Sequence, residues 1–160
     1  MGIQTGLNFN DLKIVQYSYV YRDVEEHAKL LEGMFKVPKF RIFEMKGGYI
    51  RYRGKREQIS IKMAVGYMFN VQIELIEWID GDCSFKEFLD AGREGFHHIG
   101  ALVEDYEGYL AYCKEIGIDI IQYGRDITRW TYLATEEGIG VILEIIEKNK
   151  LISSYFKVVG

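Results

Sequence analysis

Short apolar and polar runs alternate along most of this chain, and two segments with helical periodicity interrupt them. Apolar residues recur every three or four positions from Ala28 to Phe35, which predicts one helix. A similar stripe from Tyr109 to Ile116 predicts a second helix, and Gly117 is a suitable stop signal. β-rich runs follow each helix, at about 39–46, 49–53, 60–64 and 71–78, then at about 119–123, 130–134 and 141–147. The first two of these runs are separated by a predicted turn at Gly47-Gly48.

The two halves of the chain repeat the same order of elements. Before the first helix, a β-type run ends at Asp23, seven residues after Gln16. Before the second helix, a similar run ends at Asp105, seven residues after His98. Each aspartate can accept hydrogen bonds from the first turn of the helix that follows. The last runs are also alike, Ile-Glu-Leu-Ile-Glu at 73–77 and Leu-Glu-Ile-Ile-Glu at 143–147. We therefore predict a duplication of a strand–helix–strand–strand–strand unit.

Composition limits the classes of protein to consider. The 160 residues fit one domain, and 48% apolar with 28% charged residues is the usual mix of a globular protein. A net charge of -4 provides no broad positive field for nucleic acid or an anionic membrane. No apolar run approaches the roughly 18 residues of a membrane span. Cys83 and Cys113 do not form a disulfide framework, and residues 1–11 lack a signal-peptide core, so we expect a cytoplasmic protein.

Four polar residues occupy paired positions in the two halves. Gln16 and Glu74 lie in apolar β-runs of the first half, and His98 and Glu144 lie in those of the second. Burying a carboxylate is costly unless it is paired or bound to metal. If these faces meet in one cavity, the amide, imidazole and two carboxylates form a divalent metal site. The alternative is that each glutamate lies on the solvent face of an antiparallel sheet. Strand alternation should send His97 to the face opposite His98.

Two other features have a plain and a functional interpretation. Arg51, Arg53, Lys55 and Arg56 form a local positive patch. We favour a solvated hairpin there, while the functional alternative is a clamp for a phosphate or carboxylate tail, such as that of coenzyme A. The tail at 149–160 carries several large apolar side chains, so we expect it to pack on the body or on a second subunit.

Three segments resemble the vicinal oxygen chelate superfamily, which includes glyoxalase I, bleomycin-resistance proteins, extradiol dioxygenases and methylmalonyl-CoA epimerase. Residues 95–105, Gly-Phe-His-His-Ile-Gly-Ala-Leu-Val-Glu-Asp, resemble the start of the second module of the epimerase. Residues 140–145 resemble the closing strand of that module, and residues 71–75 resemble the matching strand of the first module. The resemblance covers about residues 13–148.

This resemblance implies an α+β fold in which two tandem βαβββ modules form a cupped, barrel-like mixed sheet around a central cavity. The whole chain, 1–160, would be one such domain, with module 1 at about 13–80, module 2 at about 95–148 and a C-terminal tail at 149–160. The implied metal ligands are Gln16, Glu74, His98 and Glu144, which would hold one divalent ion (Zn, Ni, Co, Mn or Fe). The family usually has His at the position of Gln16, and glutamine offers a neutral oxygen ligand instead.

The resemblance also implies a chemistry. One histidine among the matched positions disfavours the iron-dependent dioxygenase branch, which needs two. The remaining branch is a metal-dependent isomerase, epimerase or lyase that acts through an enolate next to a carbonyl. Glu144 is the first candidate for the catalytic base and Glu74 for its partner on the opposite face. We expect a small-molecule substrate such as an acyl-CoA or a thiol adduct, no nucleic acid or membrane partner, and a homodimer. The alternative is a non-catalytic protein of the same fold that sequesters a small molecule, as bleomycin-resistance proteins do.

Overall fold

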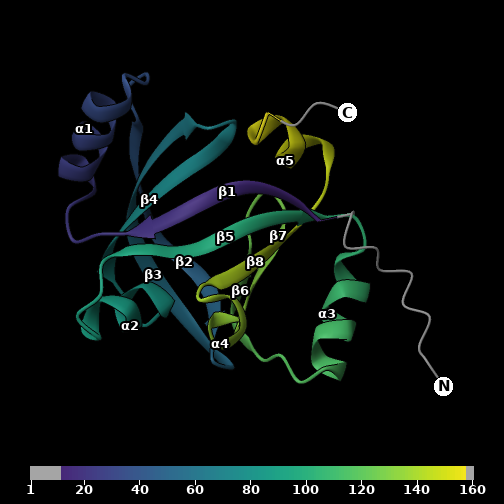
Figure 1. Cartoon of the computed structure of the whole chain (residues 1–160). Helices are drawn as coiled ribbons and strands as arrows, with labels where there is room; N and C mark the ends of the chain where they lie inside the picture. The colour runs from purple at the N-terminus through teal and green to yellow at the C-terminus, as the bar shows by residue number, and fades with distance from the viewer. Residues whose placement is uncertain (1–11, 158–160) are drawn as a thin grey trace.

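Two copies of one βαβββ unit follow each other in the computed structural model, which describes residues 12–157 (Figure 1). The first unit contains β1 (Lys13–Val20), α1 (Val24–Phe35), β2 (Arg41–Tyr52), β3 (Lys55–Met68) and β4 (Val71–Asp80). The second contains β5 (Gly95–Val103), α3 (Tyr106–Glu115), β6 (Ile120–Arg125), β7 (Arg129–Leu133) and β8 (Ile142–Glu147). Three short helices complete the chain: α2 (Ser84–Asp90), α4 (Glu136–Ile139) and α5 (Lys150–Tyr155). The predicted α+β fold class is confirmed.

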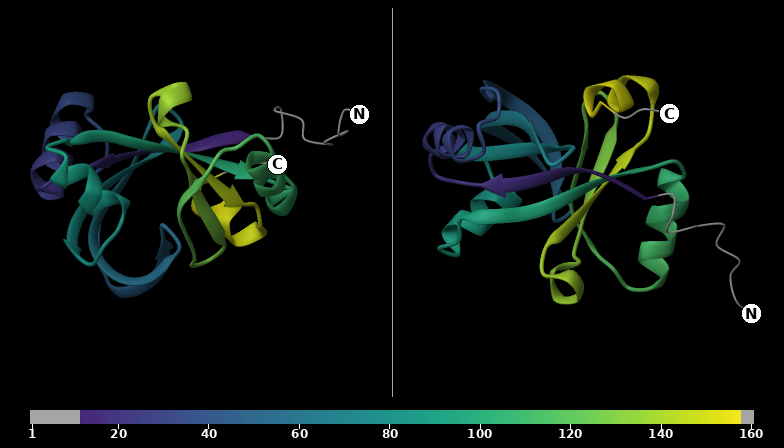
Figure 2. Two further views of the ribbon diagram at one scale, coloured as in Figure 1. Left: turned by 90° about the horizontal axis from the view of Figure 1, so that it is seen from below. Right: turned by 45° about the horizontal axis from the view of Figure 1, so that its top comes forward.

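The strands close into a barrel with the order β1-β4-β3-β2-β6-β7-β8-β5. Within each unit the first and last strands pair in parallel, β1 with β4 and β5 with β8. The units meet within this one chain through the antiparallel pair β1–β5, whose strands run side by side (Figure 1). Figure 2 shows the two units on either side of this pair. The opposite seam is much weaker, because β2 and β6 are in register only at Arg51–Tyr123 and Tyr52–Gln122.

The predicted capping residues begin both main helices. The Asp23 carboxylate accepts a hydrogen bond from the backbone N–H of Glu26 at 3.0 Å, and Asp105 accepts one from Gly108 at 3.0 Å. These bonds satisfy donors that the first turn of a helix leaves free. Helix α3 ends just before Gly117, whose φ of 82° is the left-handed conformation typical of a helix stop. None of the described helices is long and apolar enough to cross a membrane.

The predicted boundary inside β2 is wrong. The two predicted runs, 39–46 and 49–53, overlap one long strand, Arg41–Tyr52, in which Gly47-Gly48 form a bulge rather than a turn. The register with β3 skips from Met45 to Gly48, and Gly47 has a φ of 67°. Glycine adopts this conformation without strain, so the extra residue bends the strand and does not end it.

The C-terminal segment packs on the body of the domain, as expected. Helix α5 places Ile152 and Phe156 in a buried cluster with Val15, Leu102 and Ile146. The Tyr67 hydroxyl donates a hydrogen bond to the backbone carbonyl of Tyr155 at 2.6 Å. Residues 158–160 of the predicted tail lie outside the described part. Helices α2 and α5 were not predicted from the sequence.

Candidate functional site

Helices α1 and α3 cover the outer face of the sheet, and the candidate carboxyls lie on the opposite face, toward the barrel interior. On β4, Ile73 and Leu75 belong to an apolar cluster with Val24 and Ala28 of α1, outside the sheet. Because successive side chains alternate, Glu74 points to the opposite face, inside the barrel. The same logic holds for β8, where Leu143 and Ile145 pack in a cluster with residues of α3 and leave Glu144 inside. Glu74 is 8% exposed and Glu144 is 7% exposed, so neither lies on a solvent face.

The first unit supplies a hydrogen-bonded group around Glu74. The Ser18 hydroxyl donates to Glu74 Oε1 at 3.0 Å, and Gln16 Nε2 donates to Glu74 Oε2 at 3.1 Å. Gln16 Nε2 also donates to Gln72 Oε1 at 2.7 Å. Sequence analysis did not find Ser18 or Gln72, although each lies two residues from a candidate and therefore on the same strand face.

The second unit brings His98 to both carboxyls. His98 Nε2 lies 3.2 Å from Glu144 Oε2 and 3.8 Å from Glu74 Oε1. The ring is fully buried, and its Nε2 has no well-aligned hydrogen-bond partner among the described residues. The Tyr132 ring packs against it at a tilt, with the ring centres 4.6 Å apart. The structure therefore brings together Gln16, Glu74, His98 and Glu144.

A bulge at His97 overrides the simple alternation expected for the two histidines. In the β1–β5 register, Ser18 is opposite His98 but Tyr19 is opposite Phe96, so His97 is the extra residue. Instead of separating, the two rings meet with their Nδ1 atoms 2.9 Å apart. His97 also contacts the rings of Phe85 and Phe88 of α2, at centre distances of 5.4 Å and 5.0 Å.

The surroundings of His97 allow one arrangement of protons in which the His98 imidazole directs a lone pair toward the carboxyls. The backbone of Ser84 lies close to the His97 ring, whose Nδ1 faces His98 Nδ1 at 2.9 Å. If His97 donates to the Ser84 carbonyl, its Nδ1 accepts and His98 Nδ1 donates. His98 Nε2 then presents a lone pair toward Glu74 and Glu144. Burial lowers the pKa of His98 to about 3, so the ring is neutral near pH 7.

Burial raises the pKa of both carboxyls, whereas it lowers the pKa of His98. Loss of hydration and, to a smaller extent, the nearby Glu144 charge raise the pKa of Glu74 to about 8, although hydrogen bonds from Ser18 and Gln16 oppose the rise. Burial likewise raises the pKa of Glu144 to about 8, with a smaller contribution from the charge of Asp126. Two oxygen acceptors and a nitrogen lone pair thus converge where a proton or a cation is needed to compensate them.

Gly100 leaves the space that lets these groups converge. It is opposite Gln16 on one side and Glu144 on the other. A Cβ at this position would lie 3.1 Å from Gln16 Oε1 and 3.3 Å from Glu144 Oε2. Any larger residue would therefore crowd two of the candidate ligands.

The carboxyls open onto a cavity of about 350 Å³ inside the barrel. Gln16, Glu74 and Glu144 form its polar wall, and most of the remaining wall is apolar, including Met63 and Ile76. Helix α5 adds Ile152, Tyr155 and Phe156. The volume lies in the range of small-molecule sites, which typically combine an apolar lining with a few polar groups.

The donor set suits a divalent metal, although it is not arranged as a finished site. Within residues 12–157, no three His, Cys, Asp or Glu side chains form a preformed metal cluster. The buried, unpartnered His98 Nε2 beside two carboxyl groups nevertheless has the chemistry of a metal ligand. Cys83 does not contribute to this chemistry, because burial raises the pKa of its thiol to about 11.

Comparison with known proteins identifies the class to which this fold and site belong. The sequence profile of the glyoxalase/bleomycin resistance protein/dioxygenase superfamily matches residues 15–132. The chain therefore belongs to this superfamily, and the resemblance seen in the sequence is confirmed. A search of curated protein sequences finds no match.

Solved structures show the same fold at low sequence identity. Methylmalonyl-CoA epimerase from Mycobacterium tuberculosis is 14% identical with a TM-score of 0.66, over 92% of this chain and 96% of that one. A hypothetical protein from Bacillus halodurans is 20% identical with a TM-score of 0.64, over 87% of this chain and 96% of that one. A Streptomyces coelicolor methylmalonyl-CoA epimerase variant in complex with 2-nitronate-propionyl-CoA is 16% identical with a TM-score of 0.63, over 86% and 95%.

Proposed function

We propose that this protein is an isomerase, epimerase or lyase that moves a proton at a carbon next to a carbonyl group. The observation that carries this proposal is the pair of buried carboxyls, Glu74 and Glu144, which lie at the wall of one cavity with His98 Nε2 3.8 Å and 3.2 Å from their oxygens. A carboxylate positioned beside a bound substrate can act as a catalytic base. Their placement on β4 and β8 lets them approach a bound carbon from two sides.

The two carboxyls differ in freedom, which suggests different roles. Glu74 is held by hydrogen bonds from Ser18 and Gln16. Among residues 12–157, the nearest polar partner of Glu144 is His98, with Nε2 3.2 Å from Oε2, and no hydrogen bond of good geometry restrains the carboxyl. We therefore assign the first proton abstraction to Glu144 and the return of a proton on the other face to Glu74. Return from the opposite face inverts the carbon and gives epimerisation.

We further propose that Gln16, Glu74, His98 and Glu144 hold one divalent ion. When bound, such an ion acts as a Lewis acid that stabilises the negative charge of an enolate. The neutral His98 ring offers its Nε2 lone pair, and the apolar cavity wall excludes water around the reacting group. The candidate ions are Zn, Ni, Co, Mn and Fe.

The substrate class follows from the cavity and the structural neighbours together. Neighbours of the same fold bind methylmalonyl-CoA and 2-nitronate-propionyl-CoA. A small acyl-CoA with an acidic carbon next to its thioester carbonyl is therefore our first proposal, and a thiol adduct of a ketoaldehyde is the second. The cavity of about 350 Å³ accommodates either reacting group.

A non-catalytic binding protein is the competing function. The mostly apolar wall and the contribution of Ile152 and Phe156 from α5 favour it, because they would enclose an apolar ligand. This alternative gives no reason for two interior carboxyls beside a histidine with an unpartnered nitrogen.

The decisive experiment combines metal analysis with proton exchange. Purified protein is assayed for metal by elemental mass spectrometry and for deuterium uptake at the carbon next to the carbonyl of methylmalonyl-CoA, by NMR in D₂O. We expect about one divalent ion per chain and exchange that Glu144→Gln abolishes. Glu137→Gln, which changes an exposed glutamate outside the cavity, is the matched control.

Two results would contradict the proposal. Exchange that persists in Glu144→Gln would exclude Glu144 as the base. Absence of exchange with both methylmalonyl-CoA and the glutathione adduct of methylglyoxal, in protein loaded with divalent ions, would favour the binding protein.

A further inference from the structure

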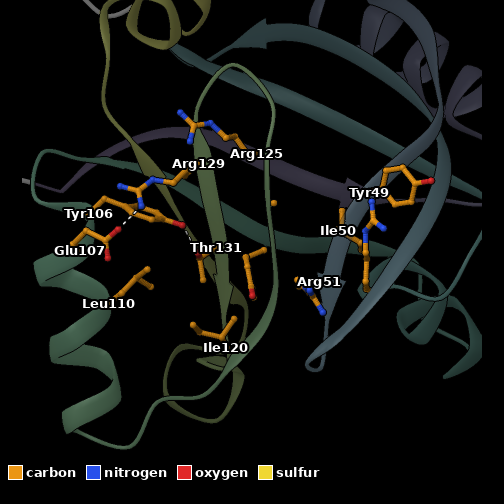
Figure 3. A pocket seen from close by; sticks show the side chains of 13 residues that line it. Tyr49, Ile50, Arg51, Tyr106, Glu107, Leu110, Ile120, Arg125, Arg129 and Thr131 are labelled. Carbon is orange, nitrogen blue, oxygen red and sulfur yellow. Dashed lines mark hydrogen bonds and ion pairs between the residues drawn. The ribbon is translucent and has the colours of Figure 1, made fainter.

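A second pocket, of about 490 Å³, lies outside the catalytic proposal and is lined by residues of β2, β3, α3, β6 and β7 (Figure 3). It surrounds the short seam at which Arg51 of β2 is opposite Tyr123 of β6. Tyr49 and Ile50 line both this pocket and the barrel cavity. Its volume also lies in the range of small-molecule sites.

Like charges face each other in this pocket. Arg51 is directly opposite Arg56 in the β2–β3 register, and Arg125 is directly opposite Arg129 in the β6–β7 register. All four arginines line the pocket. Like charges opposite one another on neighbouring strands destabilise a sheet. Two repulsive pairs thus line the same pocket, one on each side of the seam between β2 and β6.

Only one of these arginines is neutralised by the described residues. Arg129 Nε lies 2.9 Å from Glu147 Oε2, and Arg129 also pairs with Glu107. Arg51, Arg56 and Arg125 make no ion pair with any residue in the range 12–157. Four arginines and Glu107 give the lining a formal charge of +3, in a chain whose net charge is -4.

The rest of the basic hairpin behaves as the plain interpretation predicted. Arg53 does not line the pocket and is bound instead by Glu87, with Nη2 2.7 Å from Oε1. Lys55 is exposed and also lies outside the pocket. Of the basic patch seen in the sequence, Arg53 and Lys55 therefore lie outside the pocket, and Arg51 and Arg56 line it.

We propose that this pocket binds the phosphate groups of a small phosphorylated ligand. Guanidinium groups match phosphate oxygens with two parallel hydrogen bonds, and several arginines share the charge of a diphosphate. Exposed apolar surface beside them, from Tyr123 and Ile120, suits the organic part of such a ligand. The guanidinium of Arg56 lies 4.0 Å from the centre of the Tyr49 ring, which holds it at the edge of the pocket. The inference does not depend on the proton-transfer chemistry proposed for the barrel.

Isothermal titration calorimetry at low salt tests this site, with pyrophosphate and ADP as probes and citrate as the carboxylate comparison. We expect both phosphate probes to bind, more weakly as the salt concentration rises. Arg51→Gln and Arg125→Gln should each weaken binding by about tenfold or more, because each removes a charged hydrogen-bond donor. Lys55→Gln, which removes the same charge from the same hairpin, should bind as the unchanged protein does.

Three outcomes would overturn the assignment. One is no binding of pyrophosphate or ADP at millimolar concentration. Another is binding that Arg51→Gln and Arg125→Gln reduce no more than Lys55→Gln does. The third is tighter binding of citrate than of pyrophosphate, which would indicate a carboxylate site. Glu144→Gln should leave phosphate binding intact, so failure of the catalytic proposal and failure of this one are distinguishable.

Discussion

Replacing Glu144 by glutamine should make the metal-free protein less sensitive to alkaline pH. Folding raises the pKa of Glu144 from 4.5 to about 8. The folded state therefore binds the proton more tightly than the unfolded state does. The stability associated with this group is fully present below pH 4.5 and is lost as the pH rises through about 8. One such carboxyl lowers the free energy of unfolding by up to about 1.4 kcal/mol per pH unit. Glu144 alone therefore lowers it by on the order of 3 kcal/mol between about pH 5 and about pH 8.

Urea unfolding of chelator-treated protein, followed by the fluorescence of Trp78 and Trp130, measures this loss. Glu74 has a similarly raised pKa, so Glu144→Gln should remove about half of the pH dependence. Glu137→Gln should follow the curve of the unchanged protein, since Glu137 is exposed. An unfolding free energy that stays constant over this pH range would refute the reasoning. The same conclusion would follow if Glu144→Gln had the slope of the unchanged protein.

Three further changes test the site and its surroundings. Gly100→Ala should weaken divalent-ion binding by about tenfold in a calorimetric titration, because the new methyl group crowds Gln16 Oε1 at 3.1 Å and Glu144 Oε2 at 3.3 Å. Phe156→Ala should lower the free energy of urea unfolding by about 3 kcal/mol, since it empties a buried site under α5; an unchanged value would mean that the helix does not stabilise the body. Arg51→Gln should slightly raise that free energy in phosphate-free, low-salt buffer by relieving repulsion, and high salt should remove the difference.

The module order and the inward carboxyls could be predicted because both depend on local sequence. In Ile73-Glu74-Leu75, the period of two sends the glutamate away from whatever covers its apolar neighbours. The amphipathic stripe of α1 indicates that a helix provides this cover. The same pattern recurs around Glu144, and two occurrences in matching order supported a duplication.

The features that were missed depend on contacts between distant segments. The bulge at His97 is defined by the register of β5 against β1, which no local pattern of residues encodes. The arginine pocket is lined from both units, by Arg51 of β2 and Arg125 of β6, around the seam at which these strands pair. The turn predicted at Gly47-Gly48 became a bulge for a similar reason, because pairing with β3 continues on both sides.

The two units carry different residues at one matched position, which explains why their carboxyls are not equivalent. Ser18 is opposite Glu74 in the β1–β4 register, and Gly100 is opposite Glu144 in the β5–β8 register. Ser18 donates a hydrogen bond to Glu74 at 3.0 Å, whereas Gly100 has no side chain to donate one. At this matched position, Ser18 thus restrains Glu74, whereas Gly100 leaves space beside Glu144. A proton-transfer group must change its hydrogen bonds during the reaction, so this difference supports our proposal that Glu144 is the base and Glu74 its fixed partner.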